Sequence, residues 1–326
     1  MRVFVAGGTG ALGRPLLRAL HGRGHEVFAL TRHPEKHSLI EALGARVVFG
    51  DALDASGLVR AVGAVEPSHI VHLLTALPPG GPLRSKDLRS TDRLRVEGTA
   101  NLLRAAVEAG AKRIVAESFM GAYGTAGSAE LRNEDSPLAP VPRRSALGAS
   151  INALRTLEKT LLDAREAGSI EAVVLRYGLV YGPEVPSTVA MTRRLRKRQV
   201  FVPGGANGVA SFVHADDAAQ ATVAVLEADQ PSAVYNVVDD EPMPLMAYLS
   251  LSSQLAGAPL PRKAPAWLIR LAAPILAEAF FTQLPLSNSR AKNELGWTLA
   301  YPTLREGLPQ TARVLEPGDP PPSVGE

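Results

Sequence analysis

The sequence predicts an α/β protein with a doubly wound parallel sheet and a smaller C-terminal mixed lobe. Two observations predict this fold. Apolar strand-like runs alternate with helical spacing through the first half, and the alternation becomes irregular from Val180 onward. Strands that alternate with helices require right-handed crossovers, which give a parallel sheet covered by helices on both faces.

The elements follow one another regularly up to residue 176. We expect strands at 2–6, 25–30, 46–49, 69–74, 113–116 and 172–176. We expect helices at 15–20, 35–43, 55–65, 92–109 and 148–167, each marked by apolar residues at helical spacing. The stretch 119–147 breaks this rhythm with glycines, prolines and charges, so it predicts a long loop beside an active site.

Composition excludes several functional classes. The chain has 326 residues, 46% of them hydrophobic, which is enough to bury a core without cross-links. With no cysteine it has no disulfide, no thiolate zinc site and no cysteine nucleophile, and we identify no metal site. A net charge of only +3 and 5% aromatic residues argue against a nucleic-acid partner.

Nothing in the sequence predicts a membrane segment. We identify no signal peptide, because the chain enters an apolar strand at once. The apolar stretch 264–281 is interrupted by Pro265, Arg270, Pro274 and Glu278, so it is too short to span a bilayer. We therefore expect a cytoplasmic protein with no membrane partner, and a flexible tail at 316–326.

A glycine-rich turn joins the first strand to the first helix. Its residues are Gly7, Thr9, Gly10, Ala11, Leu12 and Gly13. In this context the glycines permit a tight turn and close approach of a pyrophosphate, which rests on the helix N-terminus. The turn therefore predicts a dinucleotide site on a Rossmann-like sheet, and an ordinary glycine turn is the alternative.

The end of the second strand indicates which dinucleotide binds. A carboxylate there would hold the ribose 2′-hydroxyl of NAD, but the sequence has Thr31, Arg32 and His33 instead. Arginine can pair with a 2′-phosphate in a bidentate manner, so the sequence favours NADP(H) over NAD(H). A solvated basic turn is the alternative interpretation of Arg32.

Several ordered motifs resemble one known family. They are Gly7–Gly13, Gly50-Asp51, Glu97–Leu103, Leu175–Pro183, Ser211–Asp217, Tyr235–Pro242, Glu294–Trp297 and Leu304–Leu308. Together they resemble the extended short-chain dehydrogenase/reductases, in the NAD-dependent epimerase/dehydratase-like branch. The resemblance implies an NADP(H)-binding Rossmann domain at 1–180. It also implies a substrate-binding lobe at 181–315, with some segments returning to the core.

The resemblance also implies further cofactor contacts. Asp51 and Ala52 would lie at the adenine, and Tyr177 and Leu179 near the nicotinamide. Leu73, Leu74 and Thr75, at the end of the fourth strand, would line the cofactor.

The chain departs from the family at the catalytic pair. The family uses Tyr-x-x-x-Lys, in which the lysine lowers the tyrosine pKa and the phenol exchanges a proton with the substrate. None of the six tyrosines here is followed by lysine four positions later. The equivalent positions are Leu147 and Ile151, or Ser150 and Leu154. Two nearby hydroxyls remain as catalytic candidates, Ser118 and Tyr123; Ser118 stands one position before the expected hydroxyl, where Phe119 lies.

Two other features have open interpretations. The basic run Arg193–Arg198 is a solvated helix face or an anchor for an anionic substrate. His214 and Asp216 are expected to be structural, with Asp216 and Asp217 capping a helix that begins at Ala218.

Three functional hypotheses follow. The first is an NADP(H)-dependent oxidoreductase acting on a small carbonyl, quinone or activated alkene, with an atypical proton donor. The second is a non-redox lyase, isomerase or cyclase on the same fold, and the third is a catalytically inactive NADP(H)-sensing protein. We expect a small-molecule substrate and, on base rates, a homodimer.

Overall fold

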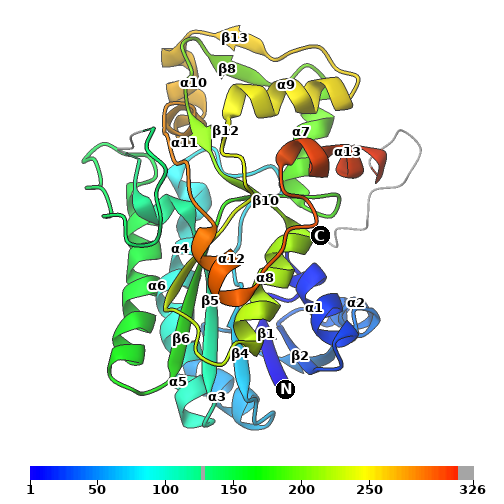
Figure 1. The fold of residues 1–326 in the computed structure, drawn as a ribbon, viewed down its shortest axis with the longest axis vertical. Coiled ribbons are helices and arrows are strands. Elements are labelled where there is room, and N and C mark those ends of the chain that lie inside the picture. Colours follow the sequence, from blue (N-terminus) through cyan, green and yellow to red (C-terminus); the bar gives the residue numbers. More distant parts are fainter. Residues whose placement is uncertain (126–128, 315–326) are drawn as a thin grey trace.

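The computed structural model describes residues 1–125 and 129–314. The tail predicted at 316–326 lies outside the described residues. The central sheet has seven strands in the order β11-β6-β5-β4-β1-β2-β3, and every neighbouring pair is parallel. The predicted fold class, a Rossmann-like doubly wound sheet, is confirmed (Figure 1).

The strands and helices of the central sheet and its covering layers agree closely with those expected up to residue 176. The strands are β1 (Arg2–Ala6), β2 (Glu26–Thr31), β3 (Arg46–Phe49), β4 (His69–His72), β5 (Arg113–Phe119), β6 (Glu171–Tyr177) and β11 (Val234–Val237). The helices are α1 (Gly13–Gly22), α2 (His37–Ala42), α3 (Ala55–Gly63), α4 (Arg89–Arg93), α5 (Thr99–Glu108), α6 (Gly148–Glu166), α8 (Ala215–Glu227) and α12 (Ser289–Leu295). A stretch of π-helix, Leu94–Gly98, joins α4 to α5, so the helix expected at 92–109 is not uniform.

Two apolar clusters hold the layers together. One lies between the sheet and α1, α2, α8 and α12, and the other between the sheet and α3, α5 and α6. Because side chains alternate along a strand, successive residues of β5 serve opposite layers: Val115 joins the first cluster, and Ile114 and Ala116 join the second. The same alternation determines which face of the sheet each side chain at the end of β5 points to.

The upper part of the molecule in Figure 1 consists of shorter elements. They are β7 (Leu179–Tyr181), α7 (Pro186–Arg196), β8 (Phe201–Pro203), β9 (Val209–Ala210), β10 (Phe212–His214), β12 (Met243–Pro244), α9 (Leu245–Leu255), β13 (Arg262–Ala264), α10 (Ala266–Ala272), α11 (Pro274–Ala279) and α13 (Leu304–Val314). None of the described helices is long and apolar enough to cross a membrane.

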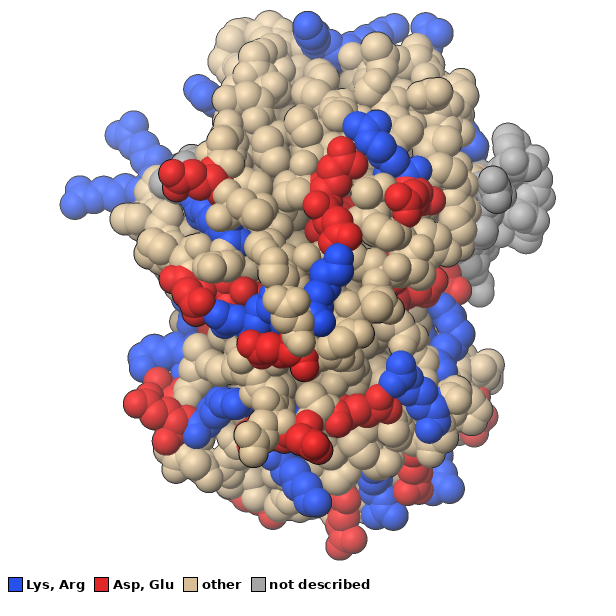
Figure 2. Space-filling model, viewed as in Figure 1, with Lys and Arg blue, Asp and Glu red and all other residues tan. Residues whose placement is uncertain are grey.

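The basic run lies in and just after α7 and is partly engaged in structural contacts. Arg194 donates a hydrogen bond to the carbonyl of Gly80 at 3.1 Å, which links this lobe to the loop after β4. Arg196 donates to the carbonyl of Ala256 at 3.2 Å. Blue side chains also project from the top of the molecule, with no red ones beside them in this view (Figure 2).

The expected helix cap at Asp216 and Asp217 is wrong in register. Helix α8 begins at Ala215, three residues earlier than expected, and the His214 ring accepts the backbone N–H of Asp216 at 3.2 Å. Both aspartates therefore lie in the first turn, where the helix dipole stabilises a negative charge. Asp217 also accepts the backbone N–H groups of Ala300 and Tyr301 at 2.7 and 3.0 Å, so its role is structural.

Candidate active site

The glycine turn brings β1, α1 and β4 into close contact. Gly7 has φ +99°, and a Cβ there would lie 2.5 Å from the carbonyl oxygen of Leu73. A Cβ on Gly13 would collide with the backbone of Gly7 and Gly8. Only glycine fits these two positions, because the backbone segments approach one another too closely for a side chain.

The same turn fits a dinucleotide phosphate. The amides of the first turn of α1 have no side-chain cap, because Leu12 occupies the capping position. A Cβ on Gly10 would meet only the Gly7 carbonyl oxygen, at 3.3 Å, so a ligand can approach the backbone there. Thr9 and Ala11 belong to the same turn, in which the Gly10 N–H donates to the Gly7 carbonyl at 3.0 Å, and the turn presents the positive end of the helix dipole.

Arg32 and Asp51 lie together at the carboxyl ends of β2 and β3. The guanidinium of Arg32 is 3.7 Å from a carboxylate oxygen of Asp51, and the two side chains are 60% and 41% exposed. An exposed ion pair of this length contributes little, so the guanidinium can turn toward a phosphate at small cost. Ala52, next along the chain, is buried, and its carbonyl accepts the amide of Asn101.

The remaining predicted cofactor residues surround the carboxyl ends of β4 and β6. Leu73 is buried beside Gly7, whereas Leu74 is half-buried and Thr75 is exposed. Tyr177 is buried, and its hydroxyl lies 2.6 Å from that of Thr222 in α8. Leu179 is half-buried, and its backbone N–H donates to the backbone carbonyl of Ser211 at 2.8 Å.

Ser118 and Tyr123 belong to one buried network. The Ser118 hydroxyl donates to Glu158 at 2.6 Å, and Glu158 pairs with Arg176 through two contacts of 3.0 and 2.7 Å. The Arg176 guanidinium lies 4.6 Å from the centre of the Tyr123 ring. The Tyr123 hydroxyl is 2.9 Å from the side-chain oxygen of Asn236, and burial raises its pKa. Both candidate hydroxyls thus have protein partners, and their catalytic role stays a prediction.

A second polar cluster, which sequence reasoning missed, lies where α6 meets the π-helical stretch. Ser150 donates to Asp92 at 2.7 Å and accepts from Arg95 at 2.8 Å. Arg95 is buried, and its only charged contact within 4 Å among the described residues is Asp92, at 3.4 Å. Ser150 is one of the positions considered for the missing tyrosine, so a hydroxyl remains there but without a lysine beside it.

Glu117, also missed, ends the apolar part of β5. It is partly exposed, yet its surroundings raise the pKa of its carboxyl to about 7, mainly by desolvation, which the positive charge of Arg95 opposes. No hydrogen bond or ion pair to its carboxylate is found in the described part of the chain. The available signal was a charged residue in a buried strand, immediately before Ser118.

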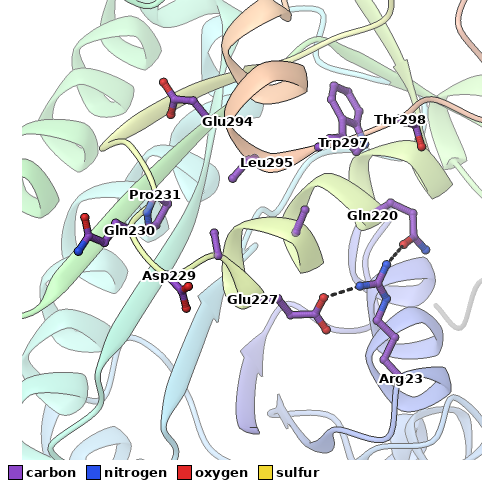
Figure 3. Close-up of a pocket in the computed structure, with 13 residues that line it drawn as sticks. Arg23, Gln220, Glu227, Asp229, Gln230, Pro231, Glu294, Leu295, Trp297 and Thr298 are labelled. Atoms are coloured by element: carbon purple, nitrogen blue, oxygen red, sulfur yellow. Dashed lines mark hydrogen bonds and ion pairs between the residues drawn. The ribbon is translucent and has the colours of Figure 1, made fainter.

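A hollow of about 560 Å³ lies far from these residues. Figure 3 shows Arg23 reaching Glu227 and Gln220 at its edge. Arg23 follows α1, and Glu227 and Leu295 end α8 and α12, so the hollow lies at the amino edge of the parallel sheet. The glycine turn lies at the opposite, carboxyl edge, where ligands of such sheets bind.

The sequence matches one known protein family. Residues 3–238 match the model of the NAD dependent epimerase/dehydratase family. The chain belongs to this family. The predicted resemblance, and with it the prediction of an oxidoreductase enzyme, is confirmed.

Individual relatives agree with this membership. A Streptomyces sp. protein named 3-diazoavenalumate denitrifying reductase is 39% identical over 314 residues, which cover 94% of this chain and 99% of the relative. The 2-alkyl-3-oxoalkanoate reductase of Stenotrophomonas maltophilia is 28% identical over 279 residues, or 81% of this chain and 78% of the relative. The UDP-glucose 4-epimerase of Thermus thermophilus, in complex with NAD, has a TM-score of 0.79 at 24% identity, covers 97% and 99% of the two chains, and shares the fold.

Gly13→Ala should weaken binding of the pyridine nucleotide at least tenfold, about 1.4 kcal/mol, because the turn must shift to admit the methyl group. The matched control is Gly22→Ala in the same helix, where a Cβ would meet nothing within 4 Å and binding should not change. Calorimetric titration measures both. Wild-type affinity in Gly13→Ala would contradict the placement of the phosphates on this turn.

Ser118→Ala and Tyr123→Phe should each lower the unfolding free energy by about 1 kcal/mol, since each removes a buried hydrogen bond. If the network is structural, turnover should stay within roughly threefold of wild type. Thermal unfolding and steady-state rates test this. A loss of turnover of about a hundredfold at unchanged melting temperature would instead establish the catalytic role.

Proposed function

We propose that this protein is an NADP(H)-dependent reductase that delivers hydride to an electrophilic carbon of a small organic substrate. The observation that carries the proposal is Arg32: an exposed guanidinium directly after β2, where an NAD-binding protein of this fold places a carboxylate. The uncapped start of α1 supports it by providing for the pyrophosphate. The names of the reductase relatives also favour reduction.

When bound, the nicotinamide would supply hydride, and the protein's residues would bind and orient it. Arg32 would pair with the 2′-phosphate, and Asp51 and Ala52 would lie at the adenine. Gly7, Thr9, Gly10, Ala11, Leu12 and Gly13 would hold the pyrophosphate. Leu73, Leu74, Thr75, Tyr177 and Leu179 would surround the nicotinamide half, at the carboxyl ends of β4 and β6.

The substrate class follows from the relatives only as a proposal. Carbonyl, quinone and activated-alkene compounds remain the expected substrates. The name of the Streptomyces relative, 3-diazoavenalumate denitrifying reductase, adds diazo compounds. Carbonyls, quinones and activated alkenes take up hydride and a proton, whereas a diazo compound in its protonated, diazonium form takes up hydride and releases N2. Each reaction oxidises one NADPH, so one NADPH-oxidation assay can compare them.

A non-redox lyase, isomerase or cyclase is the second candidate, because the Tyr-x-x-x-Lys pair is absent from the sequence. It predicts product without net oxidation of NADPH, whereas a cofactor sensor predicts binding without any product. Oxidation of NADPH in step with loss of one panel substrate supports the reductase. Unchanged NADPH absorbance across the whole panel contradicts it.

Arg32→Glu should reverse the cofactor preference, because it replaces the phosphate partner by a charge that repels phosphate. We expect NADPH affinity to fall at least tenfold, about 1.4 kcal/mol, with NADH affinity unchanged or improved. Arg46→Glu is the matched control: the same charge change on a 73% exposed side chain that begins β3, at the other edge of the sheet. Calorimetry with both cofactors measures the ratio, and equal losses in the two variants would contradict the assignment.

A further inference from the structure

The position of Glu117 follows from the register of the sheet. His72 of β4 pairs with Ala116 of β5, so the next residues, Leu73 and Glu117, stand side by side at the carboxyl edge. Leu73 in turn touches the glycine turn through its carbonyl. Glu117 therefore lies two strands from the turn, roughly 10 Å away at ordinary strand spacing.

Chain topology sets which end of a dinucleotide reaches this point. The strand order reverses between β1 and β4, and a ligand crosses the sheet at that place. Arg32 and Asp51 mark the adenosine side, over β2 and β3. The opposite end of the ligand must then extend over β4 and β5, where Glu117 lies.

Glu117 and Ser118 point to opposite faces of β5. Glu117 pairs in register with Leu175, which belongs to the cluster under α1 and α8, and it interacts electrostatically with Tyr177 on that side. Ser118 reaches Glu158 of α6 on the other face. Of the two neighbours, Glu117 is partly exposed as a residue, whereas Ser118 is 1% exposed.

The other polar groups near Glu117 are poorly suited to exchange a proton. Arg95 does not give up its proton in a protein and is held by Ser150 and Asp92. The hydroxyl of Tyr177 is buried against Thr222, and burial raises its pKa.

His72 is also excluded. It is fully enclosed, its two ring nitrogens contact Thr99 and the backbone N–H of Leu74, and desolvation lowers its pKa to about 4. His72 is therefore neutral at pH 7, and both of its ring nitrogens already have hydrogen-bond partners.

We propose that Glu117 faces the nicotinamide end of the site and is the acid that protonates the substrate oxygen, in place of the missing tyrosine. This rests on the proposed function. Hydride adds to the carbonyl carbon as the C=O π bond opens, and the Glu117 proton passes to the oxygen, giving an alcohol, the oxidised cofactor and a carboxylate. Solvent then reprotonates Glu117 through the opening that leaves it partly exposed.

The first test uses the charge of the cofactor and needs no substrate. The nicotinamide ring is positive in NADP⁺ and neutral in NADPH, so only NADP⁺ favours the ionised carboxyl. With a pKa of about 7, Glu117 is half-protonated at pH 7, and NADP⁺ should release about half a proton more than NADPH does. Calorimetry in buffers of different ionisation enthalpy measures that difference.

NADP⁺ and NADPH differ only in the nicotinamide ring. Any proton uptake or release caused by the 2′-phosphate is therefore the same for both and drops out of the difference. His33 lies 3.2 Å from Arg32, at the end of the site where both forms carry the same 2′-phosphate. Hence His33→Gln should keep the difference between NADP⁺ and NADPH, and Glu117→Gln should abolish it while NADPH affinity stays within roughly threefold.

The second test is kinetic and uses the best carbonyl substrate of the panel. Glu117→Gln should lower kcat about a hundredfold and remove the ionisation near pH 7 from the kcat/KM profile, whereas Glu117→Asp should restore part of the rate. Melting temperatures close to wild type establish that both variants are folded.

The possible outcomes separate the proposed function, the placement of Glu117 and its role as the acid. No binding of either cofactor overturns the proposed function and this inference with it. Binding without a proton difference, or a difference that survives Glu117→Gln, overturns the placement of Glu117 alone. A normal kcat in Glu117→Gln overturns its role as the acid, even where the proton difference is as expected.

Discussion

The contact between the glycine turn and the end of β4 is the constraint on which the site depends. Because Gly7 has no side chain, the turn rests directly on the Leu73 carbonyl. That contact fixes the start of α1 against the carboxyl edge of the sheet, where the helix amides can meet a phosphate. It also fixes the spacing between that point and the ends of β4 and β5, where the chemistry is proposed.

The loss of the usual catalytic pair changes the electrostatics of this edge. The sequence lacks the Tyr-x-x-x-Lys spacing, and Ser150, one of the two positions considered for the tyrosine, is held between Asp92 and Arg95. A separate buried ion pair, Glu158 with Arg176, joins α6 to β6 and holds Ser118. Neither group provides a free acid, whereas Glu117, on the opposite face of β5, has a carboxyl with no hydrogen bond or ion pair among the described residues.

The sequence predicts the regular half of the protein well, for a clear physical reason. Strand–helix alternation and the glycine spacing are local signals, and they locate the sheet, the turn and Arg32 correctly. The start of α8 was misplaced because an aspartate is a common helix cap, whereas here a histidine ring performs that role. The return of β11 to the edge of the sheet depends on long-range pairing with β6, which no local pattern reveals.

The environment of Glu117 could not be predicted from the sequence either, because it depends on contacts between residues far apart in the chain. A glutamate at the end of a strand is normally solvated, and only the fold brings Arg95, Tyr177 and the end of β4 around it. Ser118 and Tyr123 were selected for their hydroxyls, but contacts with Glu158 and Asn236 become visible only when α6, β6 and β11 are assembled.

A crystal structure of the complex with NADP⁺ tests the central claim most directly, because it locates both ends of the cofactor at once. The account predicts the 2′-phosphate on Arg32, the pyrophosphate on the first turn of α1, and the nicotinamide over β4 and β5 within about 4 Å of the Glu117 carboxyl. A 2′-phosphate away from Arg32, or a nicotinamide that does not reach β5, would contradict it.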